Sequence, residues 1–393
     1  MRISLWILVG SISILGHPSS LVGQEAPPKG ILDVVFTDRD AGGPLANVTG
    51  LVVGEERVWL LDSWASQVVG ISLAGDSPVR LGRRGSGPGE FQEPVVLQRP
   101  AADALWIWDA RLRRATLLST RDGGVSSVPP LRASVPGLSL YQVLPLGGRY
   151  AAVFNTSMSP LNQPAGGQGS QGVLAWVHVE EPVPFDTLAT FPLSQAATFV
   201  VPWPDRPGGQ RIWVAPPFSD VAPNPDFSPA CGGVLVLATG GRDFEVQAFD
   251  TRGRRIGVLR QPVEGQEVLD EEWGAYLERI REPELRRLLG GQGPPARHAP
   301  IQDLRVSSAG HLWVRSSFRP SESGEMLWHR WTLESDGDRL HFRSPRTLLL
   351  PERFTLWDEE DGRLWGIHLG EFDEPSVRAY RPPWPLGAGC SGG

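Results

Sequence analysis

The chain has 393 residues, of which 40% are hydrophobic and 21% charged, so its composition is that of an ordinary globular protein. The formal net charge of −7 gives no basic surface of the kind that attracts a phosphate backbone, so nucleic acid is not an expected partner. The 46 glycines and 37 prolines fall between apolar runs rather than in tracts, a distribution typical of turns and not of disorder.

Residues 1–23 have the pattern of a signal peptide. Arg2 supplies a positive charge, Ile3–Leu15 is apolar, and His17–Gly23 is a turn-forming exit. A membrane-spanning helix needs about 20 apolar residues, more than this stretch provides, so we expect no membrane span. We expect cleavage near residue 23, export to the periplasm or the cell exterior, and a linker at residues 24–30.

Residues 47–94 predict one β-propeller blade and the joint to the next. The runs 57–62, 67–72 and 78–81 are of strand length, rich in β-branched and aromatic residues, and bounded by Gly, Asp or Pro. The joint follows at residues 82–91 as Gly-Arg-Arg-Gly-Ser-Gly-Pro-Gly-Glu-Phe, with Pro94 just after it. Short strands alternating with tight turns are typical of a four-stranded blade.

The same pattern recurs, at first about every 45 to 50 residues, which is near the length of a propeller blade. Segments that align on the second strand of this blade lie at 57–62, 104–109, 149–154, 234–238, 311–315 and 363–368. Third strands are expected at 67–73, 114–119, 173–179, 244–249, 329–333 and 376–380. Outer strands are expected at 78–81, 125–128, 185–190, 255–259 and 346–350.

The sixth repeat has no outer strand of its own, while Ile31–Phe36 near the N-terminus is strand-like and unassigned. We expect this run to complete the sixth blade, because closing the ring removes an exposed sheet edge. The sequence therefore predicts an all-β, six-bladed β-propeller over residues 31–385, closed by an N-terminal strand, with a flexible Gly-rich tail at 386–393.

Asp62 with its polar turn, together with the joint at residues 82–94, resembles an NHL repeat, whose blades end in a Gly-rich loop, an acidic or amide residue, Phe and Pro. The resemblance covers about 45 residues, near one repeat length, and fades in the later blades. Residues 244–315, with a helical insertion between two strand runs, resemble exported bacterial six-bladed propellers of the TolB-like kind. These resemblances imply the fold and little about activity.

Large insertions gather where the repeats are longest: 156–172, 194–225, 263–300 and 317–326. In an up-and-down blade these loops emerge on one face, so we expect that face to carry any site. The insertion between blades 4 and 5 is expected to be helical, starting at Asp270 and again at Pro283 and stopping at Gly290. It could cover the channel as a lid, or pack its apolar stripe on the propeller's side, which the sequence favours.

The histidines show no metal-binding spacing and no H-E-x-x-H motif, and we expect neither a metal nor another cofactor. His311 is expected to be a polar turn residue. His368 follows a second strand towards the loop-bearing face and is the one histidine proposed for a ligand site. No catalytic residue can be named.

Arginines gather on the same face, and Arg83, Arg84, Arg111, Arg113 and Arg242 are the candidate ligand-binding residues besides His368. Arginines in such a run more often form a solvated rim that pairs with acids such as Glu90. The acids at the ends of the second strands of blades 1 and 2, Asp62 and Asp109, are expected to satisfy turn amides.

The two cysteines leave two possibilities open. An exported chain could bridge Cys231 to Cys390, but the sequence favours one buried thiol and one exposed thiol in a frayed tail. For function, the sequence favours a monomeric, non-enzymatic exported propeller that binds a protein, peptide or glycan on the loop-bearing face. The alternative is a hydrolase or lyase acting at the channel mouth, of the lactonase or lyase propeller type.

Overall fold

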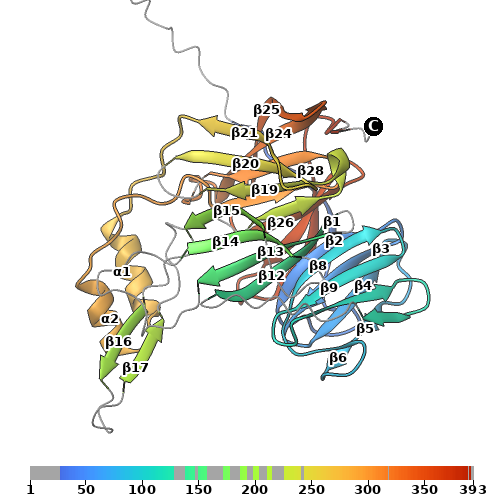
Figure 1. Ribbon diagram of the computed structural model, residues 1–393, viewed down its shortest axis with the longest axis horizontal. Coiled ribbons are helices and arrows are strands. Elements are labelled where there is room, and N and C mark those ends of the chain that lie inside the picture. Colours follow the sequence, from blue (N-terminus) through green and yellow to red (C-terminus); the bar gives the residue numbers. More distant parts are fainter. Residues whose placement is uncertain are drawn as a thin grey trace, which may run out of the picture.

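The computed structural model describes residues 27–127, 138–146, 149–156, 171–177, 186–192, 198–202, 210–214, 225–239, 243–316, 318–387 and 389–390. Within these ranges the chain forms six four-stranded antiparallel sheets arranged as the blades of a propeller (Figure 1). The all-β, six-bladed prediction is confirmed. The proposed signal peptide and Arg242 lie outside the described residues, and the division into domains stays a prediction.

The blades follow one another along the chain, each with its first strand innermost. Blade 1 is β2 (Val48–Val53), β3 (Arg57–Asp62), β4 (Gln67–Ser72) and β5 (Val79–Leu81). Blade 2 is β8 (Pro94–Ala101), β9 (Ala104–Asp109), β10 (Arg114–Ser119) and β11 (Val125–Ser127). Blade 3 is β12 (Leu138–Leu146), β13 (Arg149–Thr156), β14 (Gln171–Val177) and β15 (Asp186–Pro192).

The second half of the ring repeats this order. Blade 4 is β18 (Asp226–Ser228), β19 (Val234–Ala238), β20 (Phe244–Asp250) and β21 (Arg255–Gln261). Blade 5 is β22 (Asp303–Val306), β23 (His311–Arg315), β24 (Glu325–Asp336) and β25 (Arg339–Pro351). Blade 6 is β26 (Phe354–Glu360), β27 (Arg363–Leu369), β28 (Pro375–Arg381) and, as its outer strand, β1 (Ile31–Phe36).

The N-terminal strand closes the ring as predicted. β1 pairs antiparallel with β28, from Ile31 opposite Arg381 to Phe36 opposite Val377. Asp33 strengthens the closure, because its carboxylate binds Arg363 at 2.5 Å and Arg381 at 3.1 Å. The second strands lie between neighbouring blades and are buried along most of their length, which explains their apolar-Trp-apolar pattern.

Two repeated carboxylates organise the joints of the first blades. Asp62 is fully buried and accepts hydrogen bonds from the backbone amides of Ala46, Asn47 and Ala65, at 2.8, 3.2 and 3.0 Å. Asp109 repeats this arrangement with the amides of Gln92, Glu93 and Leu112, at 2.6, 3.2 and 2.8 Å. The prediction that these acids satisfy turn amides is confirmed.

The Gly-rich joint after blade 1 folds back on itself through the short parallel strands β6 (Arg83–Arg84) and β7 (Glu90–Phe91). Gly82 has φ +84°, and a Cβ there would lie 2.5 Å from the ring of buried Phe91, so only glycine fits. Arg114 holds the loop by donating to the carbonyls of Ser86 and Glu90, at 2.9 and 2.8 Å. The joint is thus held in place by the pairing of β6 with β7 and by the side chain of Arg114.

The strand order within each blade puts the loop between the second and third strands on the same face as the joint to the next blade. Figure 1 shows the helices α1 (Asp270–Arg279) and α2 (Pro283–Gly290) on one side of the propeller, where the two-stranded sheet of β16 (Thr198–Pro202) and β17 (Gln210–Val214) is also seen. This sheet lies in the segment 194–225, which the sequence analysis treated as a loop. The helices bury Tyr276, Ile280, Leu285 and Leu289 in a small core of their own. Among the described residues, no helix is long and apolar enough to span a membrane.

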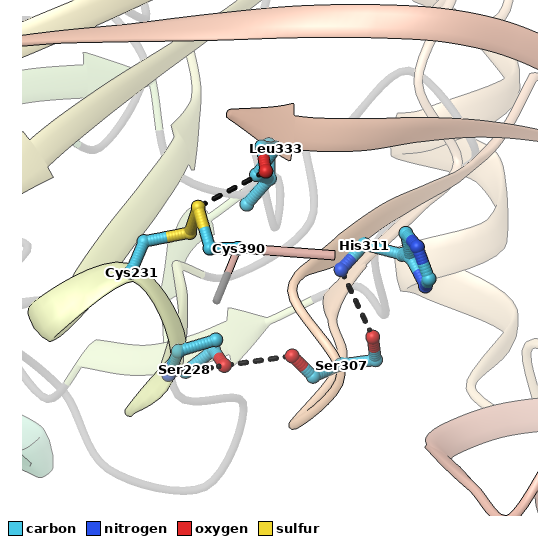
Figure 2. Close-up of a disulfide and its surroundings, with 7 residues drawn as sticks. Ser228, Cys231, Ser307, His311, Leu333 and Cys390 are labelled. Atoms are coloured by element: carbon cyan, nitrogen blue, oxygen red, sulfur yellow. Dashed lines mark hydrogen bonds between the residues drawn. A yellow bond between two sulfur atoms is a disulfide. The ribbon is translucent and has the colours of Figure 1, made fainter. Parts of the chain in front are cut away.

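The C-terminal segment is pinned across blades 4 and 5, and the preference for two free thiols is wrong. Cys231, in the 3-10 helix η2 (Ala230–Gly232), forms a disulfide with Cys390, with the Cα atoms 5.0 Å apart (Figure 2). Cys390 Sγ also lies 3.0 Å from the carbonyl oxygen of Leu333 on β24, a contact rather than a donated bond because a bridged sulfur has no proton. Leu386 is buried, and its carbonyl accepts a bond from Arg330.

Candidate functional site

The innermost strands of all six blades enclose a central channel with a volume of about 780 Å³. Its wall is built from β2, β8, β12, β18, β22 and β26, and its mouth lies at the face that carries the long loops, where Trp64 and the joint residues Arg84 and Gln92 border it. The volume is within the range of cavities that hold small molecules or segments of larger ligands.

Bulges in the inner strands turn additional side chains into this channel. β2, β8 and β26 each have a register shift that leaves one residue without a partner, at Thr49, Val95 and Trp357 respectively. All three residues line the channel. Bulges are common beside functional sites because they re-aim a side chain without ending the strand. The bulge in β26 lies deeper than the other two, so Trp357 enters the channel nearer its far end.

The mouth at blades 1 and 2 is aromatic and basic. Trp64, in the turn after β3, has 73% of its surface exposed, although a side chain of this size is usually buried. Arg84 from the Gly-rich joint and Glu93 just before β8 lie on the same part of the wall. Arg99, further along β8, is a second arginine that lines the channel. In the described part of the chain, neither Arg84 nor Arg99 forms an ion pair.

Two carboxylates lie towards the far end of the channel. Asp226 on β18 accepts a hydrogen bond from the Val306 amide of β22 at 2.8 Å. Asp358 on β26 accepts bonds from the amide of Glu359 at 2.8 Å and the hydroxyl of Ser308 at 3.2 Å, and more weakly from the amide of Val53 on β2 at 3.5 Å. Each carboxylate thus joins the inner edges of neighbouring blades, and satisfies amides that the channel would otherwise leave unpaired.

Burial raises the pKa of both carboxyls. For Asp358 burial dominates over the hydrogen bonds from backbone amides, which favour the charged form, and the pKa is raised from 3.8 to about 6. For Asp226 burial again dominates and raises the pKa, with the nearby Arg305 guanidinium opposing it. A carboxyl with a raised pKa in a cleft is a feature shared by many functional sites, although structural networks produce it as well.

Arg305 on β22 is the third charged group at this depth, and it is already engaged. Its guanidinium carbon lies 4.6 Å from the centroid of the Trp357 ring, and its Nε donates to the carbonyl of Leu356 at 3.0 Å. It also lies 3.5 Å from the carboxylate of Asp303. The arginine therefore fixes the orientation of Trp357 rather than offering a free positive charge.

The structure separates the sequence-predicted ligand residues. Arg84 lines the channel mouth, whereas the neighbouring Arg83 is 79% exposed and pairs with Glu90 at 2.8 Å, as a solvated rim would. Arg111 and Arg113 are exposed on blade 2 and are not part of the channel wall. His368 is half-buried on β27, away from the channel lining, and burial, with help from the nearby Arg378 and Arg353, lowers its pKa.

Two other histidines take part in contacts that the sequence analysis did not foresee. His311 is buried, with Nδ1 2.7 Å from Glu359 and Nε2 beside Arg330, so it belongs to a polar network between blades 5 and 6. His329 Nε2 lies 2.7 Å from the hydroxyl of Ser316, and burial lowers its pKa. Neither pair borders the channel. No three His, Cys, Asp or Glu side chains in the described ranges are placed to hold a metal ion.

The channel residues were mostly missed from the sequence. Trp64, Arg305, Trp357 and Asp358 lie in turns or on short, bulged strands, where no simple alternation marks the side chains that face inward. Asp226 lies between Pro225 and Pro229, ahead of the apolar run that starts at Val234, and nothing in that pattern marks it as a channel residue.

The fold and this cavity define a six-bladed β-propeller with an open central channel. No protein-family model and no curated protein matches the chain. It is similar to a solved structure from Bacteroides fragilis described as a candidate exported protein, at 12% identity, with 91% of this chain and 96% of that chain covered and a TM-score of 0.47.

Two further solved structures are similar over most of their length. Regucalcin, a calcium-binding protein from Agrobacterium tumefaciens, is 11% identical, with 92% of this chain and 98% of that chain covered and a TM-score of 0.43. An inactive virginiamycin B lyase from Staphylococcus aureus with quinupristin is 10% identical, with 89% and 98% covered and a TM-score of 0.39. At these levels the likeness adds nothing on chemistry, and function has to be argued from the channel itself.

Proposed function

We propose that this protein is an exported, non-enzymatic binding protein that holds part of a protein, peptide or glycan ligand in its central channel, entering from the loop-bearing face. The observation that carries the proposal is the channel of about 780 Å³, whose mouth presents exposed Trp64 and Arg84, an arginine that forms no ion pair with any described residue. An exposed tryptophan beside a charged group at the rim of a cavity is typical of a recognition surface.

The disulfide supports the proposed location. The bridge between Cys231 and Cys390 would form and persist in an oxidising compartment such as the periplasm or the cell exterior, and would be unusual in the cytosol.

The test is a block placed inside the channel. Val95 lies on the bulge of β8 and lines the cavity, so Val95→Trp narrows the channel near its mouth. The protein is screened on arrays of glycans and peptides, and the captured ligand is then titrated by calorimetry. We expect Val95→Trp to abolish binding and Arg111→Gln, on the exposed face of blade 2, to leave it unchanged. Full-strength binding to Val95→Trp would rule out the channel as the site.

The second candidate function is a channel hydrolase, favoured by one observation, the raised pKa of Asp358 inside the cavity. A carboxyl that titrates near 6 is suited to general acid or base work at neutral pH. Hydrolysis of lactone or ester substrates by the wild type, lost in Asp358→Asn and retained in His368→Ala, would support this function. Hydrolysis lost in His368→Ala and retained in Asp358→Asn would move the chemistry to the histidine, and no turnover by the wild type would remove the candidate.

A further inference from the structure

The charged groups deep in the channel are already engaged, whereas two arginines of its lining have no partner among the described residues. Asp226 and Asp358 already accept hydrogen bonds from backbone amides. Arg305 donates to the Leu356 carbonyl and packs over the Trp357 ring. Arg84 and Arg99 have no ion-pair or hydrogen-bonding partner among the described side chains, and each guanidinium carries five N–H donors. A ligand that complements this wall therefore brings negatively charged oxygen atoms.

The two arginines stand at different depths of the channel. Arg84 lies at the mouth beside the start of β8, while Arg99 follows Pro94 by five residues along that strand. At the rise of an extended strand this corresponds to roughly 15 Å of depth. A ligand that reaches both arginines must be an extended molecule carrying more than one anionic group.

The inner strands leave little room for an extended peptide to pair with them. A peptide can bind a sheet by adding a strand to an exposed edge. Here the edge amides of Val53 and Val306, from β2 and β22, already point to Asp358 and Asp226. The remaining polar lining includes the side-chain amides of Gln92, Gln98 and Gln142, which suit hydroxyl groups as donors and acceptors.

Building on the proposed binding function, we propose that the channel ligand is an oligosaccharide of uronic acids. A sugar ring packs against the exposed face of Trp64, the carboxylates of successive units bind Arg84 and Arg99, and the amide side chains bind ring hydroxyls. The charges that face this ligand also include the carboxylate of Glu93 at the mouth, which repels an anion.

The experiment uses the full disulfide-bonded protein and calorimetry with defined probes: tetragalacturonate, its fully methyl-esterified form, the galacturonate monomer, and tetraglutamate. We expect tetragalacturonate to bind and the neutral ester and the monomer to bind at least tenfold more weakly. Arg84→Gln and Arg99→Gln should each weaken binding about tenfold or more, because each loses charge-assisted hydrogen bonds. Arg111→Gln, exposed and away from the channel, is the matched control.

The outcomes separate this inference from the function on which it rests. Equal binding of the neutral ester, or tighter binding of tetraglutamate, would overturn the uronate inference; if that binding were lost in Val95→Trp, the channel would remain the site. Binding of tetragalacturonate that is insensitive to Arg84→Gln and Arg99→Gln would overturn the uronate inference alone. Binding of tetragalacturonate that survives Val95→Trp at full strength would overturn both. If none of these probes binds the wild type, the inference is also wrong. Thermal unfolding of each variant confirms that a loss of binding is not a loss of fold.

Discussion

Removing the disulfide between Cys231 and Cys390 should lower stability by an amount set mainly by the loop it closes. The bridged residues are 159 positions apart. The loss of chain entropy in the unfolded state for a loop of this size corresponds to about 5 kcal/mol, and measured values are usually nearer 2 to 4 kcal/mol. We therefore expect the double variant Cys231→Ser/Cys390→Ser to lose about 3 kcal/mol.

The assay is thermal unfolding of the wild type and the double variant, each with and without a thiol reductant. At an unfolding entropy of about 0.8 kcal/mol/K for a folded region of this size, the loss corresponds to a Tm lower by about 4 °C. Reductant should lower the Tm of the wild type by a similar amount and leave the double variant unaffected. The reasoning is refuted if the double variant unfolds within 1 °C of the wild type, about 1 kcal/mol on this scale.

A packing control separates the covalent link from the burial of the segment it holds. Leu386 is 6% exposed and packs with the tryptophans of blade 5. Leu386→Ala should cost about 2 to 4 kcal/mol through lost packing, with the disulfide intact. The unfolding temperature of Leu386→Ala should fall further when the disulfide is reduced. The packing of Leu386 stabilises the folded state, whereas the disulfide acts mainly by restricting the unfolded chain.

Three further predictions concern the ring. Deleting β1, residues 31–36, should abolish cooperative thermal unfolding because blade 6 loses its outer strand; an unchanged Tm would contradict closure. Asp62→Ala should cost about 2 to 4 kcal/mol in urea unfolding, more than Asp62→Asn, since three amides lose their acceptor. Asp358 has a pKa of about 6 in the folded state, above its ordinary 3.8, so the folded state binds this proton more tightly than the unfolded state does. The free energy of unfolding should therefore rise by about 1 kcal/mol as the pH falls from 7 to 5. Asp358→Asn should lack this rise, and equal pH dependence in both proteins would contradict the reasoning.

The blades could be predicted because their second strands are short apolar runs bounded by tight turns. The segment Ala104–Asp109 illustrates this, with each residue from Leu105 onward buried and the strand ending in an acid that binds turn amides. The sheet of β16 and β17 was missed although Thr198–Pro202 is rich in β-branched residues, because it lies outside the repeat. The disulfide could not be predicted, since bridging depends on where the tail crosses blade 5.

The channel was harder to predict than the blades for a physical reason. Arg84 and Arg83 were both named from the sequence because they are neighbouring arginines. Arg84 lines the channel, whereas Arg83 forms an ion pair with Glu90 on the surface. Which neighbour lines the cavity depends on the direction of a short β strand, and a shift of one residue reverses it. Asp358 lies one residue after a bulge, so its inward position follows from an irregularity that no periodic pattern encodes.

The pairing of β1 with β28 makes the order of synthesis matter. Ile31 pairs with Arg381, which is near the other end of the chain. At typical elongation rates the ribosome adds Arg381 roughly 20 to 70 seconds after Ile31. During that time an apolar strand, with Ile31, Leu32 and Val35 exposed even in the finished fold, has no neighbour. Such a strand invites contact with other chains and with chaperones. The same delay keeps the ring open while the chain is still being made, so ring closure is a late step of folding.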